Sequence, residues 1–269
     1  MIRSYPVFVV EHFGLDSTRF AALGAINRPL HQDLRLYFEP AVLPLPIPEF
    51  EDAHLAIQAH FSQLIRRLQI PMSRFDLEAL ADELQYDEVP GVGLGYSHGH
   101  TKGQSMKESL RIEFLTILQE LVQAGSVGDH DDIVLTSQAG KGFGPDHLSD
   151  IILSILLPRV YRYSERIFLE SGLRASQTRQ FSPTVVPADG LSPIGALQFF
   201  SLPPNPFDES IPVLLLPRQA LRRMEDSDRL GRALVSRFRE IAAKSVREEA
   251  KRAKAAGSSV RKVYFLRLG

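Results

Sequence analysis

The sequence contains no cysteine and no tryptophan among its 269 residues. The absence of cysteine excludes disulfide bonds, thiolate zinc sites, iron–sulfur clusters and a cysteine nucleophile. A chain without disulfides is compatible with a reducing compartment.

Long hydrophobic runs are also missing. The longest apolar stretches, such as Ile151–Pro158, are far shorter than the roughly 20 residues that cross a bilayer. The apolar patch near the N-terminus is too short for the hydrophobic region of a signal peptide. We therefore expect a cytoplasmic protein without a membrane partner.

The chain has almost no net charge, but its charge is unevenly distributed. Residues 218–269 contain 15 Lys and Arg against 6 Asp and Glu, a net charge of +9, whereas residues 1–217 contain 16 against 26, a net charge of −10. We therefore divide the chain into an acidic α/β body, residues 1–217, and a basic C-terminal helix and short strand, residues 218–269. We expect the second part to pack on the first as one globular unit.

Apolar residues recur at helical spacing in several segments. The pattern predicts helices over residues 17–26, 51–68, 73–84, 105–124, 145–171 and 226–256. Ser73 is the expected N-cap of the third helix, and Leu55 is expected on the buried face of the second. The helix from Pro145 has a broad apolar stripe, which indicates a central buried element, and Pro158 should kink it.

Short β-branched and aromatic runs predict strands over residues 7–10, 35–38, 133–136, 196–200, 212–217 and 260–268. The combination predicts an α+β protein with a mainly helical core and short strands. A hydrophobic fraction of 44 % and a charged fraction of 23 % are typical of a globular protein of this kind.

Two glycine-rich segments, residues 91–103 and 140–146, each precede a predicted helix. Free amides at such a junction bind phosphate in many proteins. The spacing does not match a Walker motif, because His100 and Thr101 stand where glycine and lysine are needed, and Pro145 breaks the dinucleotide pattern. Sharp turns explain these glycines equally well.

Asp146 and Asp150 are four residues apart on a predicted helix, so their carboxylates share one face. With His98 and His100 they form a candidate site for Mg²⁺ or Mn²⁺ that would support phosphodiester hydrolysis, and His130 is a further candidate ligand or base. Alternatively, the two aspartates stabilise the helix N-terminus through its dipole.

The basic region is dense in arginine and lysine, starting with Arg218, Arg222 and Arg223. Its predicted nucleic-acid-binding residues are Arg237, Arg239, Lys244, Arg247 and Lys251, which would neutralise phosphates in a salt-dependent manner. Alternatively, this region is a solvated amphipathic helix.

The stretch Gly-Phe-Gly-Pro-Asp-His-Leu-Ser-Asp at residues 142–150 resembles a G-I-G-x-D-x-I-S-D signature of uncharacterised bacterial defence or mobile-element proteins. The segments at residues 94–99 and 212–217 are similar to neighbouring elements of that family. The resemblance implies that Asp146, Ser149 and Asp150 are signature residues. Phe143 and Leu148 depart from the isoleucines of the signature. Longer members carry a C-terminal PD-(D/E)XK-type nuclease domain, and we expect none in these 269 residues.

Three functional hypotheses follow. The first is a nucleic-acid-associated accessory module of a bacterial phage-defence or mobile-element system, with DNA or RNA as ligand and a catalytic partner protein. The second is a metal-dependent nuclease that uses Asp146, Ser149 and Asp150. The third is a protein-interaction scaffold, which would show a large exposed apolar patch.

Overall fold

The computed structural model describes residues 6–84, 86, 88–95, 108–125, 145–183 and 198–224. Within these ranges, helices form most of the core and the strands make three two-stranded antiparallel sheets. This arrangement confirms the predicted α+β fold with a mainly helical core. None of the described helices is long and apolar enough to cross a bilayer.

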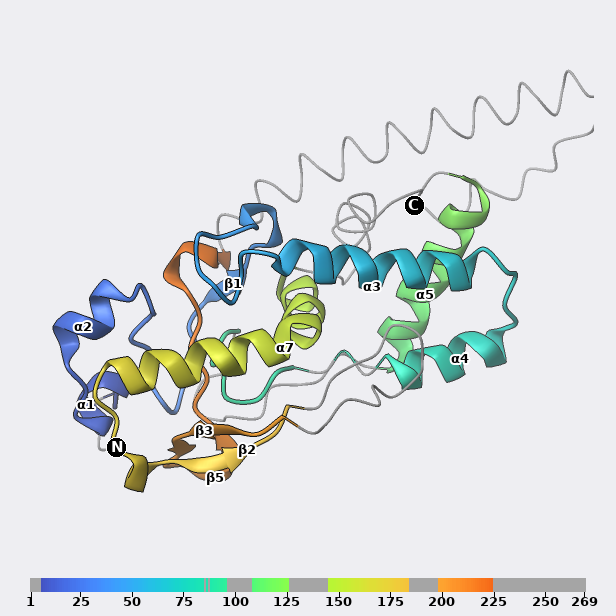
Figure 1. Cartoon of the computed structure of the whole chain (residues 1–269). Helices are drawn as coiled ribbons and strands as arrows, with labels where there is room; N and C mark the ends of the chain where they lie inside the picture. The colour runs from blue at the N-terminus through green and yellow to red at the C-terminus, as the bar shows by residue number, and fades with distance from the viewer. Residues whose placement is uncertain are drawn as a thin grey trace, which may run out of the picture.

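The longest helix, α7 (Pro145–Glu170), runs through the middle of the molecule and contacts α2, α3, β1 and β3 (Figure 1). Side chains on several of its faces are fully buried, including Ile151, Ile152 and Val160. Pro158 cannot donate a backbone hydrogen bond within a helix, and Figure 1 shows α7 bending along its length. The predicted central, kinked helix is therefore confirmed.

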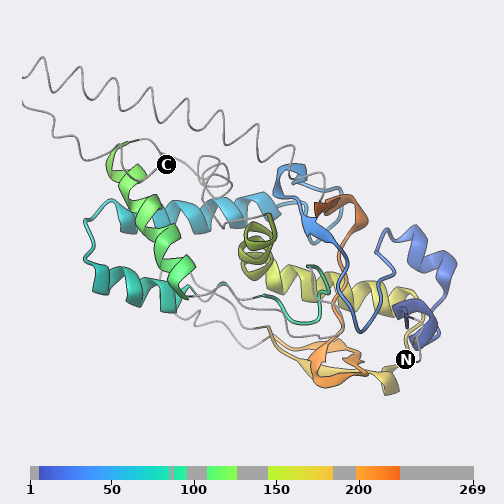
Figure 2. The same ribbon diagram turned by 180° about the vertical axis from the view of Figure 1, so that it is seen from behind.

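Three helices pack at one end of the molecule (Figure 2). They are α3 (Ala53–Leu68), α4 (Arg74–Glu83) and α5 (Glu108–Gln123). Ser73 begins α4 with a capping box, because its hydroxyl accepts from the Asp76 N–H while the Asp76 carboxylate accepts from the Ser73 N–H. The predicted cap is confirmed. Leu55 on α3 is about half exposed, so its predicted burial was wrong.

The N-terminal segment differs from the sequence prediction. Residues 7–10 were expected as a strand, but α1 (Val9–Phe13) occupies this region and only Phe8 forms an isolated bridge, with Pro29. Val9 and Val10 are adjacent and both buried, and Gly14 ends the helix in the left-handed conformation. The following helix, α2 (Ser17–Ala22), is capped by Asp16, whose carboxylate accepts from the Thr18 and Arg19 N–H groups, and it is shorter than the predicted helix over residues 17–26.

The sheets are small. β1 (Leu36–Phe38) pairs with β6 (Leu221–Arg223), β2 (Arg179–Phe181) with β3 (Phe200–Leu202), and β4 (Pro204–Asn205) with β5 (Asp208–Pro212). Three 3₁₀ turns complete the described elements: η1 (Pro40–Val42), η2 (Ala175–Gln177) and η3 (Arg218–Ala220). Because β6 pairs with β1, residues 218–224 belong to the folded body.

The segment 213–216 passes through the core in extended form. It was predicted as a strand, and its burial is confirmed, but it pairs with no strand among the described residues. Its amides bond individually, Val213 to the Pro203 carbonyl, Leu214 to the Gly91 carbonyl and Leu215 to the Ser164 hydroxyl. These bonds satisfy the backbone where a sheet partner is missing.

Candidate functional site

The predicted signature residues lie at the start of α7. Ser149 is buried, and its hydroxyl accepts a hydrogen bond from the Phe38 N–H at 3.0 Å. Because Phe38 belongs to β1, this bond joins α7 to the first strand and gives Ser149 a packing role. Asp150 is partly buried and has an interaction partner. The side chain of Asp146 is outside the described part of the structure.

The remaining predicted ligands fall outside the described residues. These are His98, His100 and His130, and the same holds for the predicted phosphate contacts Arg237, Arg239, Lys244, Arg247 and Lys251. Within the described ranges, no group of three or more His, Asp or Glu side chains is placed to hold a metal ion. The metal site therefore stays a prediction.

Arg28 forms a buried centre that the sequence did not indicate. Its guanidinium is 3 % exposed and donates to the carbonyls of Pro29, Gly91 and Leu214. Burial lowers the pKa of Arg28 to about 10, against the opposing effect of the Asp33 carboxylate. Arg28 thus joins three segments that are far apart in the sequence, which is a structural function.

Glu88 lies near the same centre. Burial, reinforced by the negative charge of Asp33, raises the pKa of Glu88 to about 7. The Asp33 carboxylate also lies against Gly95, with Oδ2 3.4 Å from the position that a Cβ would take. Arg28 lies against Gly93 and Asp33 against Gly95. The carboxylates of Asp33 and Glu88 supply too few ligands to define a metal centre.

His60 of α3 and Tyr86 form a second buried polar pair. Their Nε2 and hydroxyl atoms are 2.6 Å apart, and the rings pack edge to face. Burial lowers the pKa of His60 to about 4 and raises the pKa of Tyr86 far above its ordinary range, partly opposed by Arg67. Both groups are neutral at pH 7, which favours a role in packing.

This pair predicts a loss of stability in acid. In the unfolded chain His60 protonates near pH 6.5, whereas in the folded chain it protonates near pH 4. The stability is therefore complete above about pH 6.5 and falls as the pH drops towards 4, by about 1 kcal/mol between pH 6 and pH 5. Urea unfolding of the wild type and of His60→Gln measures this difference. An equal pH slope in both proteins would contradict it.

Four arginines lie on or beside the β1–β6 pair, and three of them, Arg35, Arg218 and Arg223, are exposed. Arg222 and Arg223 lie opposite Tyr37 and Leu36, Arg218 is on the preceding turn η3, and Arg35 precedes β1. The Met224 N–H bonds to the Arg35 carbonyl at 3.2 Å, which extends the pairing by one residue. We call these four residues, Arg35, Arg218, Arg222 and Arg223, the arginine ribbon.

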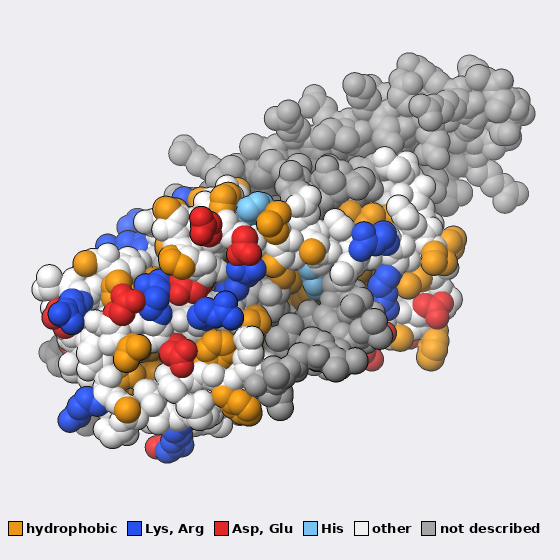
Figure 3. Space-filling view, viewed as in Figure 1, with side chains coloured by type: hydrophobic (Ala, Val, Ile, Leu, Met, Phe, Trp, Pro, Cys, Tyr) orange, Lys and Arg blue, Asp and Glu red, His pale blue; other side chains and the backbone are white. Residues whose placement is uncertain are grey.

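The described arginines differ in whether they have a carboxylate partner. Elsewhere, six arginines form ion pairs with carboxylates: Arg19 with Asp16, Arg67 with Glu83, Arg74 with Glu78, Arg159 with Asp52, Arg166 with Glu49, and Arg179 with Glu209. Arg218, Arg222 and Arg223 form no ion pair within the described residues, and the same holds for Arg66 and Arg174. Figure 3 shows the mixed red and blue groups over the body that such pairs produce.

Glu39 follows β1 directly. Its carboxylate accepts from the Tyr37 hydroxyl at 2.9 Å and from the Ala41 N–H at 3.2 Å. Arg222 donates through Nη1 to the carbonyls of Gln219 and Leu221, both at 2.9 Å, and its other donors have no partner within the described residues. The guanidinium is thereby positioned with donors available for an anion.

Sequence reasoning included Arg218, Arg222 and Arg223 in the basic region but missed Arg35. The pairing of residues 35–38 with residues 221–224 brings Arg35 to the other three. Residues 35–38 were predicted as a strand but residues 221–224 were not, so nothing in the sequence indicated this pairing.

Comparison with known proteins places most of the chain in one family. The model of a family described as a domain of unknown function (DUF8370) matches residues 14–228. A search of the curated proteins and a search of the solved structures each found no match. The matched range includes all four residues of the arginine ribbon.

Proposed function

We propose that this chain, which belongs to the DUF8370 family, binds nucleic acid through the phosphate backbone. The observation that carries the proposal is the arginine ribbon, whose arginines on η3 and β6 lack carboxylate partners in the described residues. Residues 225–269 follow the ribbon along the chain and carry twelve Lys and Arg against six Asp and Glu, although Glu225, Asp226 and Asp228 come first. The proposed interface therefore joins both groups of cations.

The chemistry of the arginine ribbon favours phosphate over bases. Tyr37 on β1 is buried, and the exposed aromatic side chains Phe75, Phe199 and Phe207 belong to other elements. Base stacking needs aromatic faces beside the cations. Without them, arginine contacts to phosphate give affinity that depends on salt and little on sequence.

The proposed role is that of an accessory module, with catalysis supplied by a partner protein. A phage-defence or mobile-element setting rests on the motif resemblance at residues 142–150 and stays a prediction. The nuclease alternative also stays a prediction. It requires Mn²⁺-dependent cleavage that is lost in Asp150→Ala, and no geometry of the described residues favours it over binding alone.

Charge reversal of the arginine ribbon tests the proposal. The triple variant Arg218→Glu, Arg222→Glu, Arg223→Glu is expected to weaken binding of labelled DNA or RNA by about a hundredfold or more in 0.1 M salt, because three phosphate contacts become repulsive. Fluorescence anisotropy measures the affinity.

The matched control carries the same charge change on arginines that have side-chain partners. The variant Arg19→Glu, Arg174→Glu, Arg179→Glu should bind within about threefold of the wild type, since remote charges are screened at a distance of about 10 Å in 0.1 M salt. An equal loss of affinity in both variants would show that binding depends only on the net charge of the protein, which would contradict a defined interface. Reversal of Arg237, Arg239, Lys244 and Arg247 in the same assay tests the residues predicted from sequence.

A further inference from the structure

Two large apolar side chains project into solvent where α3 turns into α4. Ile70 is 69 % exposed and Phe75 is 77 % exposed. We call the segment from Arg66 to Glu78 the α3–α4 tip. Figure 3 shows hydrophobic groups at this end of the molecule, with basic and acidic groups beside them. Two large exposed apolar side chains on one short segment make that segment a candidate interaction surface.

The backbone of the α3–α4 tip is held by polar contacts on both sides of Ile70 and Phe75. The capping box of Ser73 and Asp76 fixes the start of α4. Gln119 of α5 bonds to both the N–H and the carbonyl of Met72, at 2.9 and 3.4 Å. Arg67 of α3 forms an ion pair with Glu83 of α4 at 2.8 Å. The two apolar side chains are therefore presented on a rigid support.

Folding of α4 does not depend on Phe75. The residue is the second of the helix, whereas Leu77, Leu80 and Ala81 form its buried face. A polar residue at position 75 would leave the Ser73 cap and this buried face unchanged. Because the backbone around Phe75 is already held in place, little conformational entropy is lost when a partner binds this side chain. Preorganised contacts have this advantage in general.

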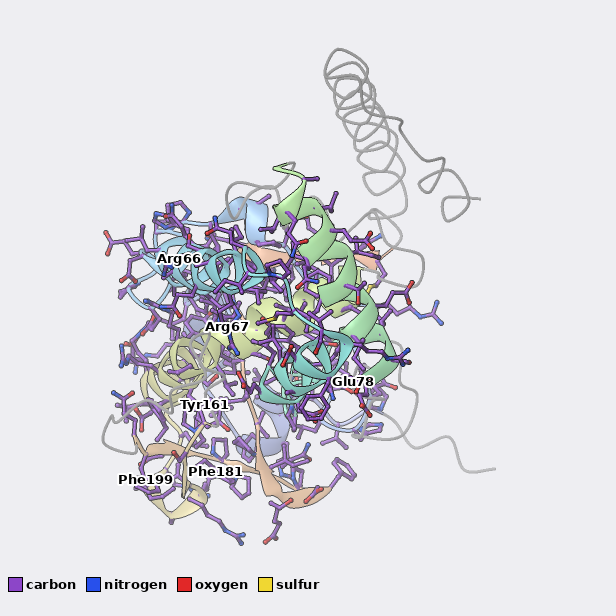
Figure 4. All side chains as sticks on the ribbon, turned by 90° about the vertical axis from the view of Figure 1, so that its right-hand side faces the viewer. Arg66, Arg67, Glu78, Tyr161, Phe181 and Phe199 are labelled. Carbon is purple, nitrogen blue, oxygen red and sulfur yellow. The ribbon has the colours of Figure 1, made fainter. Side chains whose placement is uncertain are left out.

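The charges around the tip favour a second copy of the chain as the partner. Arg66 has no ion-pair partner within the described residues, and Glu78 is paired only with Arg74, whose side chain is 86 % exposed. Figure 4 shows Arg66 at one side of this end and Glu78 at the other, with Arg67 between them. A two-fold axis through the tip would bring Arg66 of each copy to Glu78 of the other, since such contacts are self-complementary.

We propose that the α3–α4 tip is a two-fold contact between two copies of this chain, with Ile70 and Phe75 at its centre and Arg66 opposite Glu78 at its rim. The contact is small, so association is weak, with a dissociation constant on the order of 100 μM. This inference is independent of nucleic-acid binding, because it uses none of the arginine ribbon.

Sedimentation equilibrium of the full chain from about 10 μM to about 1 mM measures the association. The wild type is expected to dimerise, and Phe75→Asp is expected to raise the dissociation constant tenfold or more. Leu169→Asp is the control, because Leu169 is 71 % exposed on α7, away from the tip. A wild type that stays monomeric over the whole range would overturn the proposal, as would a dimer that Phe75→Asp leaves intact.

A charge swap tests the symmetry of the contact directly. Arg66→Glu and Glu78→Arg should each weaken self-association, because each places like charges together twice in a two-fold dimer. A mixture of the two variants should associate again, since the mixed pair has two attractive contacts. Failure of the mixture to associate, with both variants folded by circular dichroism, would overturn the two-fold arrangement.

Discussion

Replacing Gly91 with alanine is expected to lower the free energy of unfolding by about 4 kcal/mol or more. Gly91 has a φ of +86°, and a Cβ at this position would lie 2.0 Å from the Pro212 carbonyl oxygen. That oxygen is backbone and cannot move as a flexible side chain would. The Gly91 carbonyl also accepts from the Leu214 N–H and from Arg28, so the alanine would separate all three segments.

Gly125 supplies a matched control for this substitution. It has a φ of +68° at the end of α5, and no atom lies within 4 Å of the position of its Cβ. Gly125→Ala should therefore cost only the conformational strain, about 1 kcal/mol. Urea unfolding followed by circular dichroism measures both variants. Similar losses of unfolding free energy in Gly91→Ala and Gly125→Ala would contradict a steric clash between the added Cβ and the Pro212 carbonyl oxygen.

Replacing Arg166 with methionine is expected to lower the free energy of unfolding by about 3 kcal/mol. Glu49 is 6 % exposed, and Arg166 holds both of its carboxylate oxygens, at 2.7 and 2.9 Å. Burial alone would raise the pKa of Glu49, but the hydrogen bonds and charge of Arg166 outweigh burial and lower it. Without Arg166, a buried carboxylate remains with only the more distant charge of Arg162.

Two comparisons isolate this pair. The double variant Glu49→Leu, Arg166→Met should recover much of the loss, because no buried charge is left unpaired. Arg74→Met removes an exposed ion pair with Glu78 and should cost about 0.5 kcal/mol or less. Thermal unfolding at pH 7 measures all three variants, and a double variant less stable than Arg166→Met would contradict the charge argument.

The local features of the fold could be predicted from the sequence. Ser73 caps its helix as expected, because capping depends on neighbouring residues alone. The prediction of a strand at residues 7–10 was wrong. The packing of Val9 and Val10 against neighbouring segments outweighed the strand preference of valine. The predicted burial of Leu55 was wrong because helical spacing identifies the apolar face of a helix but not which edge of that face packs against the core.

The candidate sites were harder to predict because they are made by long-range contacts. Arg28 bonds to residues 63 and 186 positions away, and Arg35 reaches the arginine ribbon only through the pairing of β1 with β6. These long-range contacts of Arg28 and Arg35 cannot be predicted from a single sequence. Ser149 was predicted for catalysis from a motif, whereas its contact with Phe38 depends on how α7 packs against β1.

Binding of labelled DNA and RNA across a salt series, with Mn²⁺ present, tests the central claim most directly. For a phosphate interface, the logarithm of the affinity should fall linearly with the logarithm of the salt concentration. The slope should become shallower by about 3 when Arg218, Arg222 and Arg223 are replaced by alanine. No binding at low salt, or a slope that these substitutions leave unchanged, would contradict a phosphate interface at the arginine ribbon.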